Sequence, residues 1–112
     1  MKIAISSDGK GLDSQVSGVF GRCRYFLIVR LDGRNTEMIE AAENRASNQS
    51  GKAGISAAEL VAEKGIDAVI SGDIGPRAMD VLRQFGIKAY KGSGSIKRCL
   101  GEFAEGGLDE FH

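Results

Sequence analysis

The hydrophobic and polar positions of this chain fall into two kinds of pattern, one typical of strands and one typical of helices. Short runs rich in apolar and β-branched residues predict five strands, at residues 2–6, 24–31, 36–42, 67–71 and 87–90. Apolar residues that recur every three or four positions predict three helices, at residues 52–64, from Pro76 to Gln84 or Phe85, and at 96–104. The tail, residues 108–112, shows neither pattern and is expected to fray.

The connections between these elements predict the order of the strands. Asp32-Gly33 is a hairpin signal, so the third strand should run antiparallel to the second. Right-handed crossovers through the later helices place the first strand inside the sheet. We therefore expect an α/β fold with a five-stranded mixed sheet of order 3-2-1-4-5, an antiparallel second strand and helices on both faces. Residues 1–112 should form a single domain.

The stretch from Val69 to Ala78 joins a predicted strand to a predicted helix through a glycine turn. Gly72 and Gly75 are expected to supply backbone angles that other residues adopt only at a cost, and Pro76 suits a first helical position. Such a turn leaves backbone N–H groups at the start of the helix, and these attract anions. A tight turn without any ligand explains the same glycines, because the stretch matches neither the P-loop nor the full dinucleotide fingerprint.

Four loops should meet at one rim of the sheet, where open α/β sheets bind ligands. They follow the first, fourth and fifth strands and precede the antiparallel second strand, and three of them are rich in glycine. The first of these connections is also longer than most, which is common in functional loops. We expect a ligand crevice there, with candidate binding residues Ser7, Asp8, Phe20, Gly21, Arg22, Gly72, Asp73, Gly75, Arg77, Gly92, Ser93, Gly94 and Ser95.

Charge and composition exclude several functional classes. Fifteen basic and fifteen acidic residues give a formal net charge of zero, which argues against a general nucleic-acid or membrane binder. No apolar run approaches the ~20 residues of a membrane-spanning helix. No signal-peptide pattern precedes the first strand. We expect a cytoplasmic protein whose two cysteines are reduced.

Cys23 is the candidate metal ligand, because it follows Arg22 at the predicted rim and a neighbouring cation favours the thiolate that soft metals bind. A small hydrophobic residue at the start of a strand is the alternative. Cys99 falls on the apolar helix face of Leu100 and Phe103, so it should be buried and inert. One thiolate cannot hold a cluster alone, so other ligands would come from a second subunit, a partner or the cluster itself.

The chain lacks the residues that common hydrolytic mechanisms need. Two-metal hydrolysis requires several converging carboxylates, and only Asp8 and Asp73 fall at the rim. The serines there have no histidine to activate them, since the single histidine is His112 at the terminus. We expect a protein that binds rather than catalyses. The alternative is an anion- or nucleotide-binding module that uses the glycine loops after the fourth and fifth strands, with Arg22 or Arg77 as countercharge.

Several motifs resemble the nitrogenase iron–molybdenum cofactor biosynthesis family, the NifX, NafY and NifB C-terminal type of domain. They are Phe20-Gly21-Arg22, Asn44, Gly72-x-x-Gly75-Pro76-Arg77-Ala78, and the segment from Gly86-Ile87 to Gly92, and the resemblance extends from Lys2 to about Leu108. It implies a ribonuclease H-like fold. For some members it also implies binding or carrying of iron–sulfur or iron–molybdenum cofactor precursors, with metallocluster assembly proteins as partners. Relatives that handle the cofactor often have His immediately before Phe-Gly, where this chain has Val19.

Overall fold

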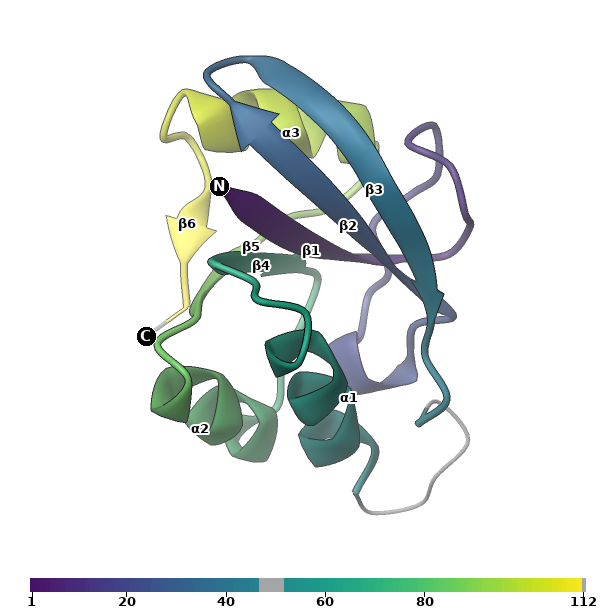
Figure 1. Cartoon of the computed structure of the whole chain (residues 1–112). Coiled ribbons are helices and arrows are strands. Elements are labelled where there is room, and N and C mark those ends of the chain that lie inside the picture. The colour runs from purple at the N-terminus through teal and green to yellow at the C-terminus, as the bar shows by residue number, and fades with distance from the viewer. Residues whose placement is uncertain (47–51, 112) are drawn as a thin grey trace.

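A computed structural model describes residues 1–46 and 52–111 of the chain, which leaves His112 outside the described residues. The strands are β1 (Lys2–Ser7), β2 (Tyr25–Asp32), β3 (Asn35–Glu43), β4 (Ala68–Ser71), β5 (Lys88–Lys91) and β6 (Asp109–Glu110). The helices are α1 (Ala53–Ala62), α2 (Pro76–Gln84) and α3 (Ile96–Ala104), with a short 3-10 turn, η1 (Phe20–Arg22). All six strands form one mixed sheet in the order β3-β2-β1-β4-β5-β6 (Figure 1).

The interior position of β1 and the antiparallel direction of β2 are confirmed. Strand β1 pairs antiparallel with β2 and parallel with β4, and β4 pairs parallel with β5. The predicted five-stranded sheet is wrong in its number of strands, because the C-terminal segment adds β6 antiparallel to β5. Expecting a frayed tail was also wrong: the Phe111 N–H donates to the Ala89 carbonyl at 2.8 Å, and its side chain packs on the core. That pairing covers an edge of β5 that would otherwise be open.

The three helices cover the two faces of the sheet (Figure 1). Helices α1 and α2, together with η1, bury one face of the sheet. Val61 of α1 and Leu82 of α2 belong to the same core as Phe26 of β2. Helix α3 buries the other face, where Leu100 packs with Ile70 and its neighbours. Strands β1 and β4 are therefore apolar at consecutive positions, as strands covered on both faces are.

The helices end close to their predicted limits. Helix α1 is shorter than predicted, and Gly65, at φ +68°, turns the chain shortly after its last residue. Helix α3 begins where predicted, and Ser95 caps it by accepting a hydrogen bond from the Arg98 N–H at 3.3 Å. Within the described part of the chain, no helix has the length and apolar character needed to cross a membrane.

Candidate functional site

The structure brings together the loops that the sequence places at one rim. The long loop, residues 8–19, runs along the turns that follow β4 and β5. The Gly72 N–H donates to the Ser17 carbonyl at 3.0 Å, and the Val16 N–H donates to the Gly94 carbonyl at 2.8 Å. The Phe20 N–H likewise donates to the Asp73 carbonyl at 2.8 Å. The loops thus converge as predicted, and their backbones bond to one another.

Buried serines fix the strand ends beneath this rim. The Ser6 hydroxyl lies 2.8 Å from the Ser71 hydroxyl and 3.3 Å from the Ser17 carbonyl. The Ser17 N–H in turn donates to the Ser6 carbonyl at 2.9 Å. Ser6 and Ser71 are fully buried, so these bonds satisfy polar groups that water cannot reach. The serines hold the long loop on β1 and β4.

Gly72 is needed for close contact, not for its backbone angles. Its φ is not positive, but a Cβ at this position would lie 2.7 Å from Gly18 Cα and 2.8 Å from the Ser17 carbonyl oxygen. Gly75 has ordinary extended angles, φ −67° and ψ 159°, and a Cβ there would meet no atom within 4 Å. The expectation that both glycines supply unusual angles is therefore wrong. The approach of the long loop is what excludes a side chain at Gly72.

Backbone hydrogen bonds tie both ends of the turn after β5 to the rest of the protein. The Gly92 N–H donates to the Ser71 carbonyl at 3.0 Å, and the Ile96 N–H donates to the Ser14 carbonyl at 3.2 Å. The Ser95 hydroxyl accepts from the next turn of α3. The Gly92 N–H is therefore already bonded within the protein and is not available to an anion.

The predicted binding residues differ in their exposure. The buried ones are Ser7, Phe20, Gly21 and Gly92; Gly72, Gly94 and Ser95 are partly exposed; the exposed ones are Asp8, Arg22, Asp73, Gly75, Arg77 and Ser93. Phe20 is a core residue whose ring centroid lies 5.0 Å from that of Phe26. The buried members shape the rim, and the exposed members are the ones that a ligand can reach.

Asn44 positions η1 and was missed as a site residue, although it stands among the motifs of the family. Its side-chain amide donates to the carbonyls of Gly21, at 3.2 Å, and Cys23, at 2.9 Å. Its carbonyl oxygen accepts from the Ala46 N–H at 3.1 Å. Asn44 is 2% exposed, so it joins the end of β3 to the segment before β2 through satisfied, buried bonds. Its place among the family motifs, directly after a strand, was the signal in the sequence.

Cys23 is buried, so the expectation of an exposed, acidic thiol at the rim is wrong. Its side chain lies in the core that η1 shares with β2, whereas the preceding Arg22 is exposed. Burial raises the pKa of the Cys23 thiol to about 12, against the weaker lowering effect of hydrogen bonds from the Ser7 backbone and Asn44. Arg22 and Cys23 are adjacent in the sequence, but the Arg22 side chain reaches solvent and the Cys23 side chain lies in the core. The guanidinium of Arg22 therefore does not stabilise a thiolate at Cys23.

Cys99 is buried on α3 as predicted. Its thiol donates to the Ser93 carbonyl at 3.2 Å, and burial raises its pKa. It differs from Cys23 in lining a cavity of about 260 Å³ between α3 and β5.

We expect iodoacetamide to modify Cys99 before Cys23 in the native protein, because the cavity gives the reagent a path that the core around Cys23 does not. Peptide mapping by mass spectrometry during the reaction measures both rates. The Cys99→Ser variant should then label only when urea unfolds it. Faster labelling of Cys23 would contradict its placement in the core.

The N-terminal ends of α1 and α2 meet beside η1. A Cβ on Gly21 would lie 2.9 Å from Gly54 Cα, and a Cβ on Gly54 would lie 3.3 Å from Ala78 Cβ. Three exposed cationic residues lie within two positions of these contacts: Arg22, Lys52 and Arg77. We call these three residues and the two helix ends the cationic corner. Cations and helix N-termini both favour a negatively charged ligand.

The donor chemistry of the described residues does not suit direct metal ligation. Among them, no group of three or more His, Cys, Asp or Glu side chains is placed to hold a metal ion. The one sulfur donor proposed at the rim, Cys23, is inaccessible.

Known proteins with similar sequences and structures identify the family. The profile of the dinitrogenase iron-molybdenum cofactor family matches residues 1–106. The uncharacterized protein MJ0580 of Methanocaldococcus jannaschii is 38% identical over 112 residues, covering 99% of this chain and 92% of that protein. The apo form of the orange protein of Desulfovibrio gigas has a TM-score of 0.88 at 28% identity, covering 98% and 92% of the two chains. A Thermotoga protein provisionally assigned to NifB has a TM-score of 0.73 at 31% identity, covering 97% and 91%. This chain belongs to the dinitrogenase iron-molybdenum cofactor family.

Proposed function

We propose that this protein is a non-enzymatic carrier in metallocluster assembly, and that it binds a preformed iron–sulfur or iron–molybdenum cofactor precursor at the cationic corner. Membership of the family supports the cargo class. The description of the orange protein structure as an apo form supports a ligand-binding role among its relatives. The partners would be the metallocluster assembly proteins that deliver and receive the precursor.

The observation that supports this proposal is the close approach of Gly21 to Gly54 and of Gly54 to Ala78, because it brings the first turns of α1 and α2 together beside η1. The exposed residues Arg22, Lys52 and Arg77 lie within two positions of these contacts in the chain. Sulfide- and thiolate-ligated clusters are anionic. Partial positive charge at helix ends and full charge on arginine side chains stabilise such a ligand without any covalent bond. The exposed Val19, next to the cationic corner, adds apolar surface against which sulfide ligands can pack.

The proposal treats the cluster as cargo that keeps its own ligands. This agrees with the burial of Cys23 and with the absence, within the described residues, of a group of side chains suited to a metal ion. Release to a partner then needs no protein–metal bond to break.

The test is an anaerobic titration of the protein with tetrathiomolybdate and, separately, with a thiolate-ligated [4Fe–4S] cluster, followed by gel filtration. We expect visible absorption to elute with the protein. The Arg77→Ala variant should bind about tenfold more weakly, as expected for the loss of one charge-assisted contact. Arg83→Ala is the matched control, since it removes an exposed arginine from the other end of α2.

One further variant, Cys23→Ser, and one further condition, competition by phosphate, decide the mode of binding. Cys23→Ser should retain uptake, because the thiol is not a ligand in this proposal. Equal affinities for the Arg77→Ala and Arg83→Ala variants, or loss of uptake in Cys23→Ser with its fold intact by circular dichroism, would refute the corner as the site. Competition by inorganic phosphate at equal ionic strength would show a general anion site instead.

A further inference from the structure

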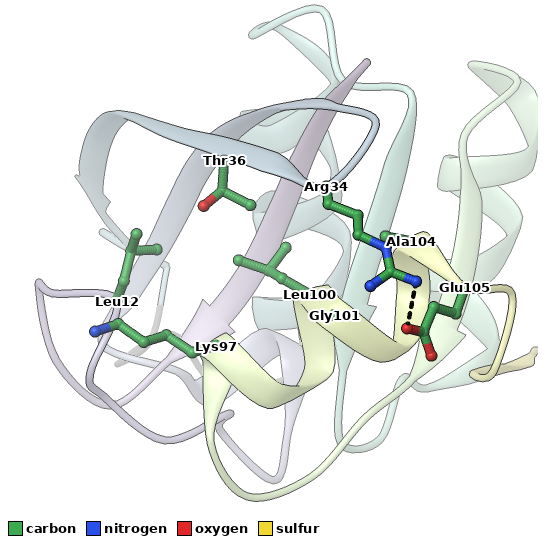
Figure 2. A pocket seen from close by; sticks show the side chains of 8 residues that line it. All are labelled: Leu12, Arg34, Thr36, Lys97, Leu100, Gly101, Ala104 and Glu105. Carbon is green, nitrogen blue, oxygen red and sulfur yellow. Dashed lines mark ion pairs between the residues drawn. The ribbon is translucent and has the colours of Figure 1, made fainter.

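A small groove lies on the face of the sheet opposite the cationic corner, between α3 and the β2–β3 hairpin. Its volume is about 210 Å³. Figure 2 shows Leu100 pointing into it from α3, with Thr36 above and Leu12 of the long loop at one side. The groove is therefore built from three segments that are far apart in the sequence. We call it the α3 groove.

The two ends of the α3 groove differ in charge. At one end, Arg34 of the hairpin forms an ion pair with Glu105 at 2.9 Å, which joins the hairpin to the end of α3 (Figure 2). At the other end, Figure 2 draws Lys97 and Leu12 on the same side of the groove, and Lys97 makes no ion pair with the described residues. One end is thus neutralised within the protein, and the other presents an unpaired positive charge next to an apolar wall.

Gly101 keeps the groove open at a cost to the helix. It lies inside α3 and lines the groove, and a Cβ built on it would meet no atom within 4 Å. Apart from proline, glycine is the least favourable residue in a helix interior. No close backbone contact requires it here, in contrast to Gly72. Alanine would favour the helix, and its methyl group would project into space that the groove now contains.

We propose that the α3 groove binds a small amphiphilic monocarboxylate, with its hydrocarbon part against Leu12, Leu100 and Ala104 and its carboxylate at Lys97. The size fits, because an apolar cavity of about 150 Å³ accepts benzene, and 210 Å³ leaves room for a carboxylate as well. The charge fits, because the unpaired cation stands at the end of the apolar surface. This site is separate from the cationic corner and needs no metal cluster.

The test uses sodium benzoate as the probe and the full chain labelled with ¹⁵N, at constant ionic strength. Benzoate should cause saturable shifts at the amides around residues 12, 34–36 and 97–105, with a Kd on the order of 1 mM for so small a ligand. Lys97→Gln should weaken binding about tenfold, as the loss of a charge-assisted contact does. Lys88→Gln, which removes an exposed lysine from β5, is the control and should bind like the parent.

The Gly101→Ala variant separates the groove from a general effect on folding. We expect its melting temperature to rise by about 4 °C, because alanine favours the helix, while benzoate binding weakens. Any of four results would overturn the proposal: shifts scattered over the surface, equal binding of neutral benzyl alcohol, equal affinities for the two lysine variants, or unchanged benzoate binding in Gly101→Ala. Because the readout is benzoate binding, failure here leaves the metallocluster proposal untouched.

Discussion

Replacing Gly72 with alanine should lower the melting temperature by about 12 °C, which corresponds to a loss of about 3 kcal/mol in the free energy of unfolding. A methyl group at this position would lie 2.7 Å from Gly18 Cα and 2.8 Å from the Ser17 carbonyl oxygen. These are backbone atoms of the long loop, so they cannot rotate away as the end of a side chain can. The loop has to move, and the bond from the Gly72 N–H to Ser17 lengthens or breaks.

Gly75→Ala is the matched control for this prediction. It places the same methyl group three residues later in the same turn, where no atom lies within 4 Å and φ is −67°. The free energy of unfolding should change by no more than about 1 kcal/mol, since alanine is a poorer helix cap than glycine but also restricts the unfolded chain. Thermal melts followed by circular dichroism measure both variants. Closely matching melting temperatures would mean that the long loop adapts and that its contact with Gly72 is not a constraint.

Asn44→Ala should lower the free energy of unfolding by about 3 kcal/mol. The substitution leaves the carbonyls of Gly21 and Cys23 and the N–H of Ala46 without their hydrogen-bond partner. All of these atoms surround a side chain that is almost fully buried. Urea denaturation followed by circular dichroism measures the loss. Asn35→Ala, which removes an exposed amide at the start of β3, is the control and should change stability by less than about 0.5 kcal/mol.

Asn44→Asp tests the same bonds through pH. The introduced carboxylate would face two carbonyl oxygens in a buried site, so its pKa in the folded protein should rise above the ordinary value of about 3.9. An acid whose folded pKa is raised loses stability as the pH increases from its unfolded pKa through its folded pKa. This variant should therefore be less stable at pH 7 than at pH 4, relative to the parent at each pH. A variant that is as stable as the parent at pH 7 would show that water reaches the site.

The local patterns predicted most of the secondary structure because each element depends mainly on its own residues. The period of apolar positions located β1, β2, β4, β5 and the three helices to within a few residues. The hairpin signal at Asp32-Gly33 and the rule of right-handed crossovers then placed β1 inside the sheet. The two residues of β6 carry no such pattern, since they become a strand only by pairing with β5. Short segments of this kind are decided by the partner that the fold offers.

The candidate site was less predictable than the fold. The convergence of the rim loops followed from topology, and the structure shows it. The burial of Cys23 could not be predicted from topology, because exposure depends on the direction of one side chain. Arg22 reaches solvent, while Cys23, the next residue, lies in the core. Burial then sets the thiol pKa, and burial is a property of the packed structure.

The sequence by itself determined the α/β class, the interior position of β1 and the family, since these depend on patterns and motifs that survive in any arrangement of side chains. Only the tertiary structure decided that Gly72 is required by contact, that Asn44 holds η1 in place, and that Gly21, Gly54 and Ala78 bring the ends of two helices together. The physical reason is that close approach, burial and hydrogen bonding between distant residues arise only when the chain has packed. A linear pattern records which residues are available, and packing decides which of them meet.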